Sequence, residues 1–349
     1  MSTTVVGIDI GSVSVRAVEV KNAHTSNPTL VRFHEVPLTS GAAHRGEVLD
    51  VREVASALRK LWAGGGFKSR NIILGMGGPR VLSRDLVVPA TSRAQIREAL
   101  PFQVQELLPY PVADALLDFY PISQRAGDNG SVVNGLLVAV IKEAVVANVA
   151  AVTQARLRTV QVDLTPFALA RALAPIRNST GLIAIVSIGA SSTNVIVVDN
   201  GIPQFVRIIA AGGEDITAAI ATQLQVTRTR AEEIKMHSGL GASPGTADAH
   251  PTVRIIQEAT NHLLVSLRDS LNYYLQSHPQ SKFEKIVLSG GGSRLAGLAA
   301  AMGQITAISV VQGSALAGVK LSSHVKSRLT PDKREAMTTA FALALGTTV

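Results

Sequence analysis

The residues Asp9-Ile10-Gly11-Ser12-Val13-Ser14 form a short polar turn inside an apolar stretch, and a similar turn, Ser187-Ile188-Gly189-Ala190-Ser191-Ser192-Thr193-Asn194, follows half a chain length later. The flanking runs, residues 5–20 and 182–198, are rich in valine and isoleucine and predict two strand pairs joined by hairpins. Glycine lets backbone N–H groups approach an anion, and the hydroxyls add donors. One such turn could be an ordinary β-turn, but two in register predict a nucleotide held between two similar lobes.

Composition sets the class of protein. The 349 residues, 46% of them hydrophobic, suffice for two modest domains or one bilobed body. With no cysteine, the chain has neither disulfides nor a thiolate metal site, which fits a reducing compartment. The eight histidines have no metal-ligand spacing, so we expect no zinc site.

The net charge of +8 and the sequence pI near 10.0 suit an anionic partner. Lysine and arginine are scattered and only 4% of residues are aromatic, so we expect peripheral membrane association and no nucleic-acid binding. No leader and no apolar run of about 18 residues is recognisable, and we expect a cytoplasmic protein.

In the first half, apolar spacing predicts a helix from Val51 to Trp62 that ends at Gly64-Gly65-Gly66, followed by a strand at residues 71–76. The glycine run is interpreted as a helix stop and not a P-loop, because Phe67 precedes Lys68.

From Val81 the character changes. Ser92 and Gln95 predict a capping box, and a helical stripe extends through Ile96, Leu100, Val104, Leu107 and Leu108. A polar loop at 125–131, a strand at 135–141 and a helix at 143–156 follow, before the first lobe resumes near Val160. We interpret this segment as an inserted subdomain, although it could simply be further α/β core.

In the second half, Gly212-Gly213 begins a helix that runs past Leu224. Helices at 228–236 and 253–276 are predicted, joined by a loop at 238–252. A strand at 285–288 leads to Ser289-Gly290-Gly291-Gly292-Ser293, and Leu295 is predicted to open a helix. That glycine run could lie against a ring or a phosphate, or be an ordinary loop.

Taken together, these motifs resemble the actin-like ATPase superfamily, which includes sugar kinases, Hsp70, MreB and FtsA. The resemblance implies a bilobed α/β fold of duplicated ribonuclease H-like domains with a small α/β insertion of the FtsA and PilM type. It implies a first lobe at 1–180 with the insertion at about 81–158. It implies a second lobe at 181–325, whose outer part covers about 206–284, and a C-terminal helical segment at 326–349 that returns to the first lobe.

The resemblance also implies ATP and Mg²⁺ as cofactors. Asp9 would hold the metal, mainly through water, and Glu232 and Lys235 would meet the nucleoside. The residues expected to bind the nucleotide are Asp9, Gly11, Ser12, Val13, Ser14, Arg16, Gly189, Ala190, Ser191, Ser192, Thr193, Asn194, Gly213, Glu232, Lys235, Gly290, Gly291, Gly292 and Ser293.

Within the superfamily, the stretches 7–19, 162–171, 189–194 and 266–274 look like the pattern of the PilM family of type IV pilus assembly. That resemblance implies a scaffold at the cytoplasmic face of the inner membrane that links pilus assembly, and so twitching motility, to the nucleotide state. Its partner would be the N-terminal cytoplasmic peptide of PilN, docked beside the insertion. PilO and other pilus inner-membrane components would be reached indirectly, and self-association is possible.

Two positions depart from the superfamily pattern. Ser187 stands where an aspartate is usual, so ATP hydrolysis is expected to be weak or absent, and Arg16 replaces a lysine. Asp163 could orient the attacking water, by resemblance, or cap the helix that begins near Pro166.

Three other protein classes share the fold. One is an FtsA-like or MreB-like filament protein, although no amphipathic tail of the FtsA kind is seen after Gly346. A sugar-type kinase would need a carboxylate base in the cleft, and none is evident. A type II secretion component would continue into a membrane span.

Overall fold

The computed structural model describes residues 4–25, 27–127, 130–174, 181–241 and 251–346. Its first sheet is built on the first predicted hairpin, in which β1 (Thr4–Ile10) pairs antiparallel with β2 (Ser14–Lys21). On one side β2 continues to β3 (Thr29–Pro37) and the short β16 (Lys320–Leu321). On the other side β1 pairs in parallel with β6 (Asn71–Met76), which pairs in parallel with β10 (Arg158–Leu164).

The second sheet repeats this topology around the second hairpin. Here β11 (Leu182–Ile188) pairs antiparallel with β12 (Thr193–Asp199), which pairs with β13 (Ile202–Ile209). On its other side β11 continues in parallel to β14 (Lys285–Ser289) and β15 (Val310–Gln312). The order β13-β12-β11-β14-β15 therefore matches β3-β2-β1-β6-β10, so both sheets are built on the same plan.

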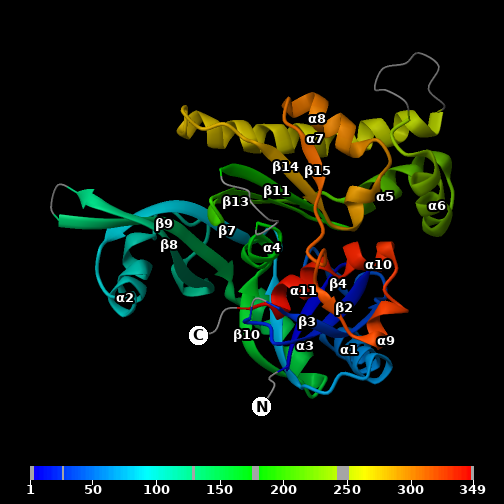
Figure 1. Ribbon diagram of the computed structural model, residues 1–349, viewed down its shortest axis with the longest axis horizontal. Helices are drawn as coiled ribbons and strands as arrows, with labels where there is room; N and C mark the ends of the chain where they lie inside the picture. The colour runs from blue at the N-terminus through cyan, green and yellow to red at the C-terminus, as the bar shows by residue number, and fades with distance from the viewer. Residues whose placement is uncertain (1–3, 26, 128–129, 175–180, 242–250, 347–349) are drawn as a thin grey trace.

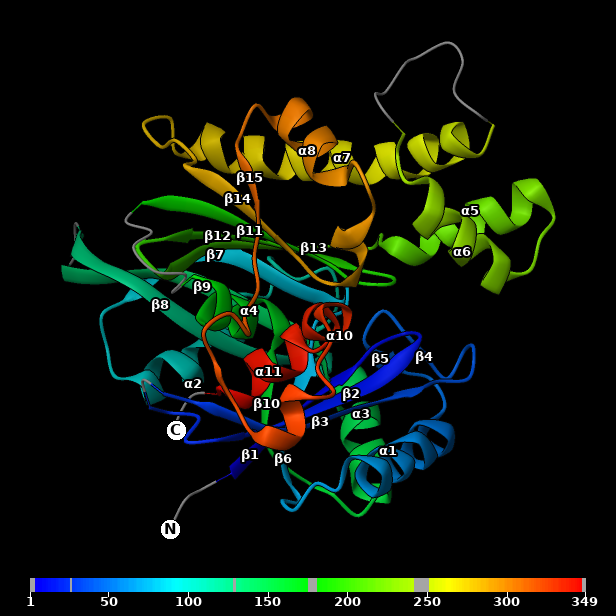
Figure 2. The same ribbon diagram turned by 45° about the vertical axis from the view of Figure 1, so that its right-hand side comes forward.

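The first sheet is covered on both faces. On one face lie α1 (Val51–Gly65) and α3 (Lys142–Gln154), side by side in Figure 2. The carboxylate of Asp50 accepts hydrogen bonds from the first turn of α1, and Gly66 ends the helix at φ 63°, so the predicted helix stop is confirmed. On the other face lies α11 (Thr338–Ala344), close enough that a Cβ on Gly7 would come within 2.1 Å of the Ala340 carbonyl oxygen.

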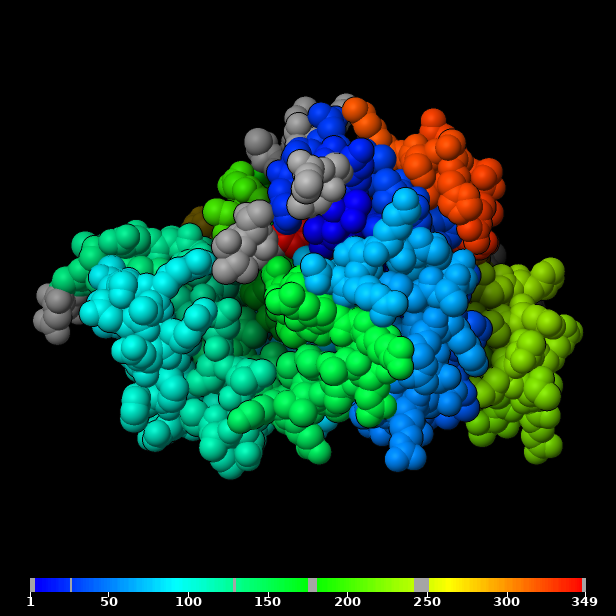
Figure 3. Space-filling model, turned by 90° about the horizontal axis from the view of Figure 1, so that it is seen from below, coloured from blue at the N-terminus to red at the C-terminus, as the bar shows by residue number. Residues whose placement is uncertain are grey.

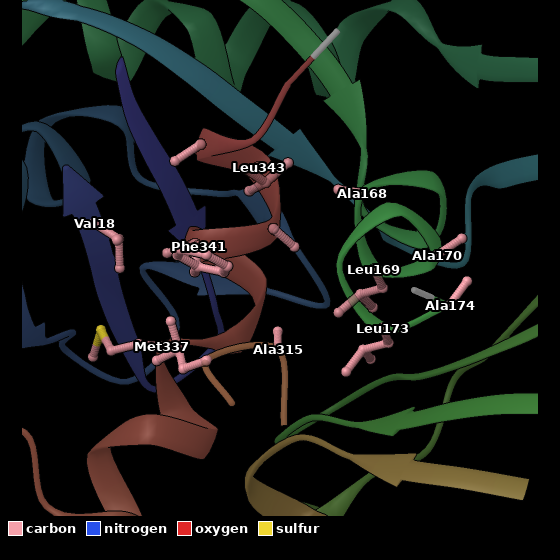
Figure 4. Packing of buried hydrophobic residues seen from close by; sticks show 14 of the residues in the cluster. Val18, Ala168, Leu169, Ala170, Leu173, Ala174, Ala315, Met337, Phe341 and Leu343 are labelled. Carbon is pink, nitrogen blue, oxygen red and sulfur yellow. The ribbon is translucent and has the colours of Figure 1, made fainter. Parts of the chain in front are cut away.

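The two lobes share one core. Between the sheets, α11 meets α4 (Thr165–Leu173), and Figure 4 shows α11 between the strand that carries Val18 and the helix that carries Leu169. The same cluster contains Val18 of the first sheet and Ile185 of the second. Any movement of one lobe relative to the other must therefore shift side chains within this shared apolar core.

In the second lobe α5 (Gly213–Leu224), α6 (Arg228–Ser238), α7 (Pro251–Ser277) and α8 (Leu298–Thr306) lie above and beside the sheet in Figure 1. The helices predicted to begin at 213, 228 and 253 are confirmed. Residues 242–250 of the predicted loop at 238–252 lie outside the described residues. The helix predicted to open at Leu295 begins instead at Leu298, because Gly297 takes a left-handed conformation (φ 86°).

The insertion is a three-stranded antiparallel sheet of β7 (Val81–Pro89), β9 (Gly130–Ile141) and β8 (Ala115–Gly127), with α2 (Arg93–Gln103) against it. It extends to the left in Figure 1. The capping box of Ser92 and Gln95 is confirmed. The predicted loop at 125–131 was wrong, because β8 and β9 stay paired as far as Gly127 and Gly130.

The helical stripe of the insertion ends earlier than predicted. Helix α2 stops at Gln103, shortly after Pro101, whose missing N–H cannot continue the hydrogen-bond ladder. Leu107 and Leu108 lie beyond the helix, yet they still pack on Leu100 and Val104.

The short elements complete the chain. They are β4 (Ala43–His44), β5 (Glu47–Val48), η1 (Val112–Asp114), η2 (Gly291–Arg294), α9 (Ser323–Lys326) and α10 (Pro331–Ala336). Across the described ranges, no helix is both long and apolar enough to cross a membrane.

Candidate functional site

The tips of the two hairpins touch. The hydroxyl oxygens of Ser12 and Ser191 lie 2.5 Å apart across the boundary between the lobes. Both tips are closed by the same internal hydrogen bond: the Gly11 N–H donates to the Ser14 carbonyl (3.0 Å), and the Gly189 N–H donates to the Ser192 carbonyl (2.9 Å). The structure therefore brings the two predicted phosphate turns together. The N–H groups of both turn glycines are already used inside their own turns.

A cluster of acidic and basic side chains lies next to the first turn. Arg16 is opposite Asp9 on the paired strand, with its guanidinium 3.5 Å from the Asp9 carboxylate and 2.8 Å from that of Glu35. Burial raises the pKa of Asp9, although the charge and hydrogen bond of Arg16 act in the opposite direction. A divalent cation at Asp9 would favour the ionised form. Arg16 is held by two carboxylates and is not directed at an empty space.

Glu35 was not predicted as a site residue from the sequence. It lies on β3 directly opposite Arg16, and its carboxylate also accepts a hydrogen bond from the Ser14 hydroxyl at 2.6 Å. The Ser14 side chain, predicted as a phosphate donor, is therefore committed to Glu35. No local sequence pattern singles out Glu35, because its contacts with Arg16 and Ser14 depend on the pairing of β2 with β3.

The second turn is anchored to helix α5. The carbonyls of Gly189 and Ala190 accept hydrogen bonds from the N–H groups of Gly213 (3.0 Å) and Glu214 (2.7 Å). The buried Thr193 hydroxyl donates to the Ala211 carbonyl at 2.8 Å, so its role is structural. The Asn194 side-chain oxygen is buried and has no hydrogen-bond partner among the described residues. Ser187 is buried at the start of this turn, between Asn194 and Ser289 on the neighbouring strands.

A buried lysine connects α5 to α6. The Lys235 ammonium donates to the Gly213 carbonyl (3.0 Å), the Thr217 hydroxyl (2.8 Å) and the Glu232 carboxylate (2.7 Å). The predicted pair of Glu232 and Lys235 thus lies on one helix face and meets Gly213. Thr217 was missed; its position one turn after Gly213, on the buried face of α5, was the signal.

The glycine loop after β14 lies beside the second turn. Gly290 is left-handed (φ 87°), and a Cβ on Gly292 would lie 2.4 Å from the Ile188 side chain, so this loop packs directly against the end of β11. A Cβ on Gly291 would have nothing within 4 Å, so its surface faces open space. The Ser293 hydroxyl donates back to the Gly290 carbonyl at 2.6 Å.

Asp163 lies apart from these contacts, at the end of β10. Its carboxylate pairs with Arg171 on α4. The alternative prediction, that Asp163 caps α4, was wrong: the N-cap position is Leu164, and no side chain caps the helix. The Asp163 carboxylate forms an ion pair with the Arg171 guanidinium instead.

Arg45 was not singled out in the sequence. Together with Gly46 it forms the two-residue turn of the β4–β5 hairpin, with φ 51° and 81°. Its N–H donates to the Ser12 hydroxyl (2.8 Å), and its guanidinium donates to the Ala210 carbonyl of the second lobe (3.0 Å). Its Nε is buried without a partner among the described residues. A non-glycine residue at such a backbone position is uncommon, and residues of this kind are often found at functional sites.

Within the described ranges, no group of three or more His, Cys, Asp or Glu side chains is arranged to hold a metal ion. A metal at Asp9 would therefore need ligands from water and from a bound anion.

Comparison with known proteins places these features in a family. A sequence model described as type IV pilus assembly protein PilM matches residues 7–348. The cell division protein FtsA of Bacillus subtilis (strain 168) is 23% identical over 257 residues, which are 67% of this chain but only 58% of FtsA.

Solved structures agree on the fold. A chain of the PilM-PilN type IV pilus biogenesis complex matches with a TM-score of 0.79 and 24% identity, covering 98% of this chain and 96% of that one. MreB 5 of Spiroplasma citri bound to AMPPNP matches with a TM-score of 0.54 and 10% identity, covering 97% and 94%. The predicted bilobed α/β fold of an actin-like ATPase is confirmed. From the family match, this chain belongs to the PilM family of type IV pilus assembly proteins.

Proposed function

We propose that this chain binds Mg-ATP between its two hairpin tips and uses the bound nucleotide to set how the lobes close. The observation that carries this proposal is the direct contact of Ser12 with Ser191, because duplicated turns from two lobes meet at one point. The hydroxyls of Ser12, Ser191 and Ser192 and the neighbouring backbone would bind phosphate. To admit a phosphate, the bond between Ser12 and Ser191 must open.

Other features fit the same ligand. The unpartnered oxygen of Asn194 and the open face of Gly291 lie on the second-lobe side. Glu232 would meet the nucleoside, positioned by Lys235, whose ammonium donates to Gly213, Thr217 and Glu232. Asp9 would hold Mg²⁺ through water. The metal, when bound, would offset phosphate charge. Ser187 stands where a carboxylate is expected, and the Asp163 carboxylate is paired with Arg171. We therefore propose that the chain binds ATP and hydrolyses it weakly or not at all.

Calorimetric titration with Mg-ATP tests the site. Gly189→Asp places a negative charge beside the phosphates, and a Cβ there would lie 3.0 Å from the Ser192 carbonyl, so we expect affinity to fall by about tenfold or more. Ser131→Asp adds the same charge on an exposed part of β9 and should leave affinity unchanged. Equal affinity in wild type and Gly189→Asp would rule out a phosphate at this turn.

We further propose that the chain is a scaffold at the cytoplasmic face of the inner membrane, and that it binds the N-terminal cytoplasmic peptide of a PilN protein. PilO and other inner-membrane components would be reached through that partner. The strand β10 supports a peptide site beside the insertion: it is the terminal strand of its sheet, and its Val160 and Val162 side chains are 51% and 39% exposed. In Figure 1, β10 lies between the first lobe and the insertion. An extended peptide adding to such an edge would cover both valines.

A labelled peptide from the N-terminus of the PilN protein of the same cell tests this site by fluorescence anisotropy. Val160→Asp with Val162→Asp should weaken binding by about tenfold or more, because charges would be buried under the peptide. Ile202→Asp, on an equally exposed apolar residue of β13, is the matched control. If the β10 variant binds as well as the control, the peptide docks elsewhere.

A further inference from the structure

A basic pocket of about 760 Å³ opens on the first lobe, at the far end of the β1–β2 hairpin from the turn. Thr4 pairs with Lys21 at this end, roughly 20 Å along the strands from Gly11. The end of α1 forms one wall, β3 forms the floor, and α9 with the residues after it forms the opposite wall. Figure 3 shows these three segments together on one face, in sky blue, dark blue and orange.

The lining is cationic. It includes Lys21, Arg32, Lys68 and Arg328, together with His324, and contains no carboxylate. Arg32 is neutralised by Glu19, a fully buried carboxylate 2.8 Å from its guanidinium. The other three cations are exposed, and within the described ranges none of them pairs with an acid. Three uncompensated positive charges therefore surround one concave surface.

The field of these charges reaches the pocket wall. His34 lies behind the glycine run, and burial lowers the pKa of this imidazole, with the positive charge of Arg328 as the next cause. The Nε2 of His324 accepts a hydrogen bond from Arg328 at 3.0 Å, which orients the guanidinium.

The pocket wall depends on its glycines. A Cβ on Gly64 would lie 2.5 Å from the His34 ring, and one on Gly65 would lie 2.3 Å from the Phe67 ring. The helix end can therefore lie against β3 only without side chains at these two positions. The glycine run, interpreted from the sequence as a helix stop alone, also shapes this pocket.

We propose that this pocket binds a phosphate ester. Its volume lies within the usual range of small-ligand sites, roughly 300–1,000 Å³. The exposed guanidinium of Arg328 suits the planar recognition of phosphate oxygens, and Lys21 and Lys68 add charge. The pocket also accounts for part of the net charge of +8 without nucleic acid.

The phosphate could belong to a soluble metabolite or to a lipid headgroup, and two probes separate these sources. Glycerol 3-phosphate is titrated by calorimetry, and vesicles of phosphatidylcholine with or without phosphatidylglycerol are used in co-sedimentation. Binding to glycerol 3-phosphate alone assigns a soluble ester. Added binding to the phosphatidylglycerol vesicles assigns a headgroup.

The variant Lys21→Glu with Arg328→Glu removes two of the free cations. We expect it to weaken binding of the responding probe by about tenfold or more. The matched control, Arg93→Glu with Arg254→Glu, changes the net charge equally at exposed positions on α2 and α7 and should bind as wild type does. Thermal melts confirm that both variants are folded. The proposal is overturned if wild type binds neither probe, or if variant and control lose binding equally.

Discussion

Among single residues, Asp9 has two opposing effects: its ionised carboxylate lowers the stability of the fold, and the same carboxylate is the proposed ligand of Mg²⁺. Its carboxyl is buried enough to raise its pKa, so at neutral pH the empty protein carries the cost of ionising it. A group of this kind stabilises the fold below its unfolded pKa of about 3.9, and that contribution is lost as pH rises through the higher folded value.

The variant Asp9→Asn should therefore melt at a higher temperature than wild type near neutral pH, with the gain vanishing in acid. Arg16 keeps its bond to Glu35 in this variant. The same variant should lose the Mg²⁺ dependence of ATP binding. Calorimetric melts across the acid range and titrations with and without Mg²⁺ measure both effects. Asp114→Asn, at an exposed position, is the control; a variant that melts like this control at every pH would contradict the prediction.

Tyr274 makes a second pH-dependent contribution. Burial raises its pKa to about 12, with the charges of Asp199 and Asp85 adding to the shift. Its neutral form stabilises the fold below the ordinary tyrosine pKa of about 10, and this stabilisation is lost as pH rises through about 12. Tyr274→Phe keeps the ring that stacks on His278 and should flatten the alkaline loss of stability.

Denaturant unfolding at a series of alkaline pH values measures this change. The neighbouring Tyr273 is 56% exposed, so Tyr273→Phe should keep the wild-type profile. Identical alkaline profiles for Tyr274→Phe and wild type would show that another group is responsible.

The residues of the candidate site were only partly predictable. Local spacing identified both turns, because their residues lie within a few positions of each other. The pair Glu232 and Lys235 was expected from the resemblance to the actin-like ATPase superfamily. Glu35 and Arg45 reach the first turn through strand pairing and through the β4–β5 hairpin. Such long-range contacts leave no local pattern, so a single sequence does not reveal them.

At the scale of elements, the packing of α11 on β1 depends on one glycine. A Cβ on Gly7 would lie 2.1 Å from the Ala340 carbonyl and 2.5 Å from the Ala344 nitrogen, both of them backbone atoms that cannot move aside. We expect Gly7→Ala to cost about 3 kcal/mol or more in unfolding free energy, because the helix must shift off the sheet.

Denaturant titration of Gly7→Ala measures this cost. Gly303→Ala in α8 is the control, since the nearest atom to its Cβ would be 3.5 Å away. There alanine should add roughly 0.5–1 kcal/mol by favouring the helix. A Gly7→Ala protein as stable as the wild type would mean that α11 is held less closely than the structure shows.

Helices and strands were predicted correctly where the apolar periodicity was strong. Their boundaries were predicted wrongly where a proline or a glycine ends or delays the element. Helix α1 begins at Val51, where the apolar spacing predicted it, and α2 begins directly after the predicted cap at Ser92. The end of α2 depends on Pro101, and the start of α8 depends on the conformation of Gly297. The pattern of apolar residues does not predict either effect on the backbone. Pairing between β8 and β9 likewise overrode the polar composition at 125–131.

At the scale of the whole molecule, the lobes are joined at two places that differ in character. The apolar contact of α4 with α11 is continuous and buried, whereas the contact at the hairpin tips consists of a few hydrogen bonds. Opening at the tips should cost far less than opening the core, because each net hydrogen bond contributes only about 1 kcal/mol. The molecule should therefore open as a hinge about the two helices.

Beside the contact of Ser12 with Ser191, the Arg45 side chain also reaches across this opening, and we expect Arg45→Ala to increase hydrogen–deuterium exchange at both tips and near Ala210 in the ATP-free protein. Arg45→Gly removes the same guanidinium but accepts φ 51° without strain, so it should be more stable than Arg45→Ala by about 1 kcal/mol while exchanging just as fast. Comparing these two variants separates the lobe contact from the backbone cost. If both exchange at the tips as slowly as the wild type does, the hydrogen bond to Ala210 does not hold the lobes together, and the contact of Ser12 with Ser191 and the packing of α4 on α11 would have to do so.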